Sequence, residues 1–325
     1  EILIGLVGSE MCIRDRNEYT FDKGRSLGLM NALFQPDMNL PVHLLSFFGH
    51  YGVPVFLFLS AYGLVAKYEH TPHVPIPSKM SFMRTHFHKL FDMMIVGFAI
   101  FIMVDAITPG SHHYAVPDII GQLVMLNNLM PNPDKVIWPG PYWFFGLMLQ
   151  VYAVYILLLR HKGWLTAVAV VVVCWGLQVV CDPQGETLNR LRYNFIGSML
   201  PFCAGLLYAR YGRPMSHAFW VGTTIISYIA VIVFGLNFQT WLWAPLFVCS
   251  AAVGTVKLLP VYANIKLSHL GKLSAALFVI HPVARKIFID ISRRGDVYTG
   301  LLLYIIACVA LAWATKIIIK MVKTR

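Results

Sequence analysis

The sequence predicts an all-α protein, a polytopic membrane helix bundle, and three observations lead to this prediction. Hydrophobic residues make up 58% of the 325 residues and charged residues only 13%, whereas soluble domains are about half apolar and about a quarter charged. The mean hydropathy is +0.65. The apolar residues also gather in runs that approach the roughly 20 residues a helix needs to cross the hydrocarbon core. A bilayer can cover this much apolar surface, and a soluble core cannot.

Nine apolar runs are long enough to be candidate spans. No low-complexity tract separates them, so we expect one membrane domain over residues 17–325. An even number of helices would place both termini on the same side, and this predicts nine spans of an expected ten. The candidates are Ser46–Ala66, Leu90–Ile107, Tyr142–Leu159, Trp164–Cys181, Tyr193–Tyr208, His217–Leu236, Trp241–Leu259, Leu273–Ile289 and Tyr298–Ile319.

The first sixteen residues differ in character from the rest. The segment Glu1–Arg16 (EILIGLVGSEMCIRDR) resembles a translated sequencing adaptor, and its apolar stretch is too short for a span or a signal-peptide core. We interpret residues 1–16 as non-native. The expected tenth helix would then precede Asn17, so the domain is expected to lack its first helix.

The distribution of charge predicts the orientation of the helices. The net charge is +11, but the basic residues lie at the ends of apolar runs and not on one polar face, so no nucleic acid partner is expected. If the segment before Ser46 is outside, fifteen Lys and Arg residues fall on the inner side and seven on the outer side. The positive-inside rule then places the C-terminus in the cytoplasm and the Ile107–Pro141 loop outside.

Neither cysteines nor histidines indicate a metal site. The six cysteines form no CxxC motif. His70, His73, His86 and His88 lie close together in the sequence, but only Glu69 is near them as a further ligand. We therefore expect no bound metal.

Three segments carry a resemblance to a known family. Gly52–Leu64 (GVPVFLFLSAYGL) resembles the signature Gly-Val-x-x-Phe-Phe-x-Leu-Ser-Gly-Tyr of the acyltransferase-3 family, with Ala61 in place of the usual glycine. Gly140–Phe145 (GPYWFF) is similar to the Trp-Phe helix that follows the large outer loop of that family. Leu270–Pro282 resembles its late Leu-Gly-x-x-Ser…Tyr-Leu-x-His helix, with Phe278 near the usual tyrosine. The resemblance covers about residues 41–319.

The resemblance implies a membrane O-acyltransferase of the bacterial inner (cytoplasmic) membrane. Such a protein takes an acyl group, commonly acetyl, from acyl-coenzyme A in the cytoplasm. It passes the group to a hydroxyl of an extracytoplasmic polysaccharide or lipid-linked glycan. The expected partners are the lipid bilayer, acyl-CoA as co-substrate and the glycan acceptor, with no bound cofactor. Two alternatives stay open, a glycan or acyl-group transporter or flippase and a non-catalytic membrane scaffold.

Candidate site residues follow from this resemblance and from the cost of charge in a bilayer. Arg84 and Lys89 are the counterparts of the family's Arg-x-x-Arg pattern and are candidates for binding the phosphates of the donor. The positive-inside rule explains the same two residues equally well. The family's catalytic mark, an Arg and a His with ten residues between them in the first helix, is absent from the sequence. The chain is therefore expected to insert into membranes without transferring acyl groups.

His281 is the remaining catalytic candidate, because it lies within a predicted span. Arg285 lies one turn later on the same helical face and is expected to line a polar cavity with it. Trp143 and Arg192 are candidates for contacting the acceptor glycan at the outer helix ends. An interfacial aromatic belt and a solvated loop are the alternative explanations for these two residues.

Overall fold

The computed structural model describes residues 21–49, 51–71, 78–130, 133–294 and 296–323 of the chain. These residues are folded into helices and contain no strand, which confirms the predicted all-α class. The interpretation of residues 1–16 and the position of Arg325 lie outside the described residues. So does any helix before Asn17, which stays a prediction.

Nine helices coincide with the nine predicted apolar runs within the described residues. They are α5 (Gly52–Tyr68), α6 (Lys79–Ile107), α9 (Trp143–Val154, continued by the π-helical turn η3, Tyr155–Leu159), α10 (Trp164–Val179), α12 (Met199–Tyr211), α13 (His217–Phe234), α15 (Ala244–Leu258), α17 (Ser274–Arg293) and α18 (Val297–Lys323).

Shorter elements connect these helices or precede them. They are α3 (Lys23–Phe34), α4 (Leu40–Gly49), α7 (Val116–Leu123), η1 (Asn127–Leu129), α8 (Pro133–Val136), η2 (Gly140–Tyr142), α11 (Glu186–Tyr193), η4 (Phe195–Ser198), α14 (Phe238–Trp241) and α16 (Val261–Gly271).

Polar side chains begin several of these helices, because the first backbone N–H groups of a helix need acceptors. The side chain of Ser78 accepts a hydrogen bond from the backbone of Ser81 at the start of α6. Ser216 caps α13 in the same way, and Asn237 caps α14. The start of each helix is thus fixed by a residue outside its apolar run.

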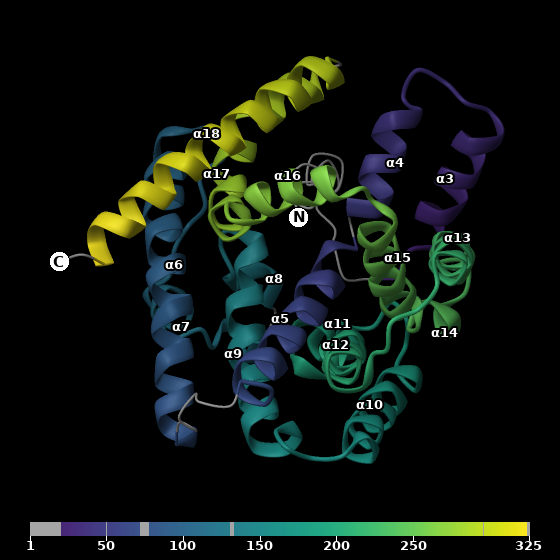
Figure 1. Cartoon of the computed structure of the whole chain (residues 1–325). Coiled ribbons are helices and arrows are strands. Elements are labelled where there is room, and N and C mark those ends of the chain that lie inside the picture. Colours follow the sequence, from purple (N-terminus) through teal and green to yellow (C-terminus); the bar gives the residue numbers. More distant parts are fainter. Residues whose placement is uncertain (1–20, 50, 72–77, 131–132, 295, 324–325) are drawn as a thin grey trace.

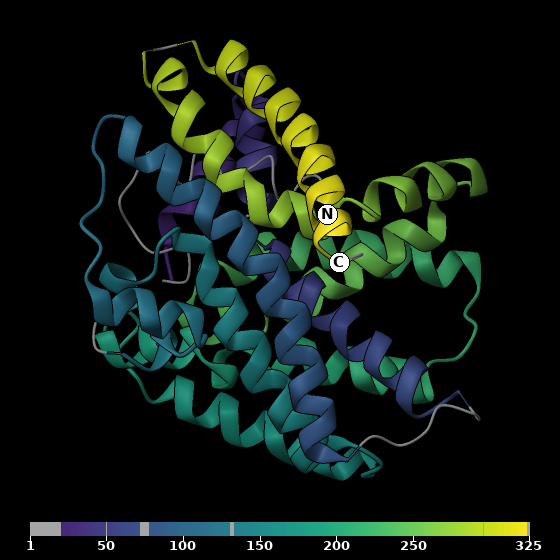
Figure 2. The ribbon, with the colours of Figure 1, turned by 90° about the vertical axis from the view of Figure 1, so that its left-hand side faces the viewer.

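The helices pack into three groups, each with its own buried apolar cluster. The largest cluster joins α5, α6, α9, α10 and α12. A second lies where α17 and α18 pack on the end of α6, and Figures 1 and 2 show α18 running beside α17 at one end of the bundle. The third joins α3 and α4 to α13, α14 and α15. The polar residues described below lie at the ends of the first two groups.

Small residues allow the closest helix contacts. A Cβ atom added to Gly205 of α12 would overlap the backbone of Phe58 on α5. A Cβ at Gly254 of α15 would overlap the side-chain hydroxyl of Thr224 on α13. Membrane helices commonly associate through such small residues, because lipid tails provide no hydrophobic driving force between helices.

The number of membrane spans differs from the sequence prediction. Among the described residues, four helical stretches are long and apolar enough to cross a bilayer: Lys79–Ile107, Gly140–Leu159, His217–Phe234 and Val297–Ile318. Two bent pairs, α4 with α5 (43°) and α16 with α17 (59°), raise the number to at most six. The apolar helices α10 and α15 are shorter, with 16 and 15 residues. Several predicted runs are therefore bent or too short in the structure, and the predicted number of nine spans is not confirmed.

Several contacts join connecting segments that the charge pattern assigns to the same side of the membrane. Contacts join the segments that were assigned to the outer side, such as Gln184 to Phe21 (2.8 Å) and Lys286 to Gly110 (2.8 Å). Other contacts join segments that were assigned to the inner side, such as Arg210 to Lys162 (2.7 Å). We call these two sides of the bundle the inner and outer ends. The outward-facing surface between them carries exposed apolar side chains such as those of α10, α13 and α18, as expected for contact with lipid.

Candidate functional site

Two polar clusters lie near opposite ends of α6. The inner cluster consists of Lys67, Tyr68, His86, Lys89 and Arg160. The outer cluster consists of Asp105, His112, Tyr114, Trp138 and Lys286. Because an α-helix rises 1.5 Å per residue, the nineteen residues from His86 to Asp105 separate the two clusters by roughly 28 Å along α6.

The aromatic ring of Tyr68, the last residue of α5, is at the centre of the inner cluster. The Lys67 ammonium lies 4.8 Å from its centroid and the Arg160 guanidinium 5.9 Å from it. The ring of His86 lies 6.0 Å away, and the charges of Lys67 and Lys89 both act on His86. Basic residues from α5, α6 and the end of η3 are thus gathered at one place.

Arg160 is the residue of this cluster that points most directly to a ligand. Its Nε and Nη2 atoms are buried, and neither has a hydrogen-bond partner within the described part of the chain. A guanidinium is planar and presents its N–H donors as a fork that matches the oxygens of a phosphate or carboxylate. Because leaving such donors buried and unpaired is costly, an anion with two acceptor oxygens would suit them.

A buried ion pair lies next to the inner cluster and holds its elements together. Arg210 of α12 donates from Nε and Nη2 to the two carboxylate oxygens of Glu69, at 2.7 Å each. Both side chains are 8% exposed. Tyr155 donates to the same carboxylate (2.9 Å), and Arg210 also donates to the carbonyl of Leu159. The pair therefore ties the inner ends of α5, η3 and α12 to one another.

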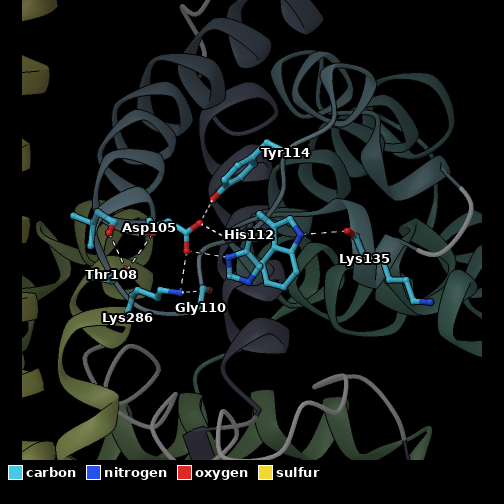
Figure 3. Close-up of polar contacts among 9 residues, drawn as sticks. Asp105, Thr108, Gly110, His112, Tyr114, Lys135 and Lys286 are labelled. Carbon is cyan, nitrogen blue, oxygen red and sulfur yellow. Dashed lines mark hydrogen bonds and ion pairs between the residues drawn. The ribbon is translucent and has the colours of Figure 1, made fainter.

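The carboxylate of Asp105, near the end of α6, organises the outer cluster (Figure 3). His112 donates to it twice, from its backbone N–H (2.8 Å) and from Nδ1 (2.9 Å). The hydroxyl of Tyr114 donates at 3.0 Å, and the ammonium of Lys286 on α17 lies 3.0 Å away. Asp105 itself is fully buried. Burial, together with the hydrogen bond and charge of Asp105, raises the pKa of Tyr114, so its hydroxyl stays a donor.

The structure separates the two predicted donor-binding residues. Arg84 and Lys89 both lie on α6 and are exposed. Five helical residues turn a side chain by about 140°, so the two point to different sides of the helix. Lys89 acts on His86 within the inner cluster. Lys67 and Arg160 accompany it there, and neither was among the predicted donor-binding residues.

His281 and Arg285 lie on α17, as predicted, and His281 is buried. The Nδ1 of His281 donates to the backbone oxygen of Phe278 in the preceding turn (2.7 Å). Arg285 is half-buried, and its charge acts on His281. Both residues therefore belong to the interior side of α17, while their cavity-lining role stays a prediction.

Trp143 and Arg192 are both buried at the outer end of the bundle. The ring of Trp143 packs edge-on against Tyr193 at 5.5 Å. The guanidinium of Arg192 lies 4.1 Å above the ring of Trp241. Both side chains thus contact other parts of the protein, and their contact with a glycan stays a prediction. Within the described residues, no group of three or more His, Cys, Asp and Glu side chains could hold a metal ion.

Four site residues are not predicted from the sequence: Asp105, His112, Lys286 and Arg160. One signal was available, because Asp105 is an acidic residue within a predicted span, where charge is costly. His112 lies in the outer loop among other polar residues and carries no comparable signal. Its importance depends on Trp138 and on Asp105, which only the folded chain brings to it.

The fold and its two polar ends define a helical membrane protein with ionisable groups on both sides. Comparison with family models identifies an acyltransferase domain over residues 26–317. The chain therefore belongs to the acyltransferase-3 family, and this membership indicates membrane acyltransferase activity. No curated protein and no solved structure matches the chain.

Proposed function

We propose that the protein is an O-acyltransferase of the bacterial inner membrane that binds acyl-coenzyme A, in the first instance acetyl-CoA, at its inner end. It transfers the acyl group to a hydroxyl of an extracytoplasmic polysaccharide or lipid-linked glycan. The inner end is the cytoplasmic side in this proposal, and the C-terminus lies there too. The positive-inside excess of basic residues supports this orientation.

The observation that carries the proposal is the basic inner cluster around Tyr68, where buried guanidinium donors of Arg160 have no hydrogen-bond partner among the described residues. Coenzyme A carries several phosphate groups on a nucleotide and a long flexible arm that ends in the thioester. Arg160, Lys67 and Lys89 would hold the phosphates. The arm would extend the thioester into the bundle toward the acceptor side. A transporter or flippase would not require a donor site of this kind, and no described contact favours one.

Donor binding can be tested without any acceptor. Coenzyme A should raise the melting temperature of the purified full chain in detergent, whereas pantetheine, which lacks the phosphates, should raise it much less. Lys89→Gln should weaken the effect of coenzyme A more than Arg84→Gln, because Lys89 belongs to the inner cluster. Equal stabilisation by coenzyme A and pantetheine would contradict phosphate binding, and equal effects of the two substitutions would contradict the assignment of Lys89.

A further inference from the structure

The imidazole of His112 is held in one orientation by residues from other parts of the chain. Its Nδ1–H donates to Oδ1 of Asp105, and its backbone N–H donates to Oδ2 of the same carboxylate. The ring of Trp138 lies against it, with the centroids 3.6 Å apart. Trp138 is fixed in turn by a hydrogen bond from Nε1 to the carbonyl of Lys135 (3.2 Å). Figure 3 shows these groups converging from α6, the outer loop and α17.

This arrangement determines which nitrogen of His112 is available. A carboxylate that accepts from Nδ1–H fixes the neutral ring as the tautomer with a lone pair on Nε2. Within the described part of the chain, the hydrogen bonds of the ring are made by Nδ1. The side chain is 25% exposed, so it can be reached from outside the bundle. Nε2 is thus an oriented hydrogen-bond acceptor at the outer end.

His86 and His281 differ from His112 in this respect. In both, Nδ1 bonds to a backbone oxygen of the preceding turn of the same helix, Phe82 or Phe278. Both rings are also buried. Their orientation is a local consequence of sitting in a helix, whereas that of His112 requires Asp105.

A structural role alone leaves part of this arrangement unexplained. The Asp105 carboxylate already receives Lys286, Tyr114 and the backbone N–H of His112. These three contacts join the loop and α17 to α6 without any help from the imidazole. The hydrogen bond from Nδ1 of His112 and the indole of Trp138 against its ring additionally fix the position of Nε2, which is a further acceptor atom.

The charge balance of the outer cluster indicates the chemical class of its ligand. The negative charge of Asp105 is offset by the ammonium of Lys286, 3.0 Å away, so this pair leaves no net charge to attract an ion. A hydroxyl can donate to Nε2, and the half-buried indole of Trp138 offers apolar surface beside it. Carbohydrates combine hydroxyl donors with apolar C–H faces and match both features.

We propose that His112, oriented by Asp105 and flanked by Trp138, forms a subsite at the outer end of the bundle that binds a hydroxyl of a carbohydrate. The proposal rests on the proposed function, since it supplies the acceptor side of that transfer. His112 holds the hydroxyl by accepting a hydrogen bond at Nε2. The subsite lies at the end of α6 opposite the inner cluster, so donor and acceptor would approach from different ends.

The test labels His112 directly and needs no enzymatic turnover. Diethyl pyrocarbonate modifies unprotonated imidazole nitrogens, and mass spectrometry of the full chain in proteoliposomes follows His112 and the exposed neighbour His113 separately. Methyl glucoside, methyl galactoside and methyl N-acetylglucosaminide serve as probes. At about ten times its Kd, a bound glycoside should slow the labelling of His112 about tenfold. The labelling of His113 should not change.

Substitutions make the result specific to the proposed geometry. Asp105→Asn should abolish the protection of His112, whereas Tyr114→Phe, which leaves the Nδ1 bond in place, should retain it. If Asp105→Asn does not insert into membranes, Trp138→Leu tests the subsite in its place and should weaken protection. The proposal is overturned if no glycoside protects His112, if His113 is protected equally, or if Asp105→Asn and Trp138→Leu both keep full protection.

This experiment is independent of the donor-binding test. If a glycoside protects His112 but coenzyme A does not stabilise the protein, the carbohydrate subsite is supported and the proposed acyl donor is contradicted. If coenzyme A stabilises the protein but no glycoside protects His112, the donor site is supported and the carbohydrate subsite is contradicted.

Discussion

Replacement of Arg210 by methionine is expected to lower the free energy of unfolding by about 3–5 kcal/mol. The substitution leaves the carboxylate of Glu69 buried without its charge partner, and breaking a buried ion pair typically costs that much. The single hydrogen bond from Tyr155 to Glu69 cannot replace the two hydrogen bonds and the positive charge of Arg210, whose donors lie 2.7 Å from the carboxylate oxygens. The measurement is the melting temperature or denaturant midpoint of the purified protein in detergent, followed by tryptophan fluorescence.

Two further variants separate this effect from a general loss of charge. Arg213→Met removes an exposed basic residue three positions away and should be close to neutral. Adding Glu69→Gln to Arg210→Met removes the uncompensated charge and should restore part of the lost stability. Equal stability of Arg210→Met and Arg213→Met would show that the ion pair contributes nothing.

The same pair predicts a dependence of stability on pH. Burial alone would raise the pKa of Glu69, but the hydrogen bonds and charge of Arg210 and the hydroxyl of Tyr155 outweigh it and lower the pKa. A lowered folded-state pKa stabilises the fold above the ordinary carboxyl pKa. This contribution is lost as the pH falls through the lowered value. The Arg210→Met protein should therefore lose less stability on acidification than the unmodified protein.

Replacement of Arg160 by glutamine is expected to weaken coenzyme A binding by about 10- to 150-fold. A hydrogen bond to a charged group contributes about 1.5–3 kcal/mol, and each 1.4 kcal/mol changes the Kd about tenfold. The loss should be much smaller for pantetheine, which lacks the phosphates. Isothermal titration of the detergent-solubilised chain measures both constants.

The control for this prediction is Lys162→Gln, because Lys162 is exposed two residues further along the same inner loop. It should change the Kd of coenzyme A only slightly. Equal effects of the two substitutions would mean that the general positive charge of the inner end attracts the donor. The buried guanidinium donors of Arg160 would then have no specific role.

Much of the fold could be predicted from the sequence, because apolar runs and basic loops are local signals. The runs around α6, α9, α13 and α18 became long apolar helices. Contacts such as those of Arg210 with Lys162 and of Lys286 with Gly110 join segments that the charge pattern assigns to the same side, while the orientation itself stays a prediction. The bends between α4 and α5 and between α16 and α17 had no comparable signal. They interrupt runs whose composition stays apolar, so hydropathy alone does not mark them.

The candidate site could be predicted only in part, because its contacts join residues far apart in the sequence. Glu69 and Arg210 are 141 positions apart, and Gly110 and Lys286 are 176 apart. No spacing rule connects such residues. Motif resemblance led to the helix that carries Lys89, but the neighbours Lys67 and Arg160 come from other helices. The geometry that orients His112 likewise arises only when the outer loop folds onto α6.

The most direct measurement of the central claim is acyl transfer across a sealed membrane. Inside-out vesicles would carry either this chain or an extended version in which a helix with the family's Arg and His precedes residue 17. Labelled acetyl-CoA would be supplied only at the cytoplasmic face. We expect the extended protein to form hydroxylamine-labile acetyl esters on glycan inside the vesicles, and we expect Arg160→Gln to reduce their formation. The chain alone should insert without forming them. Absence of ester from both proteins, or equal labelling when acetyl-CoA is enclosed on the glycan side, would contradict acyl transfer from a cytoplasmic donor to an extracytoplasmic acceptor.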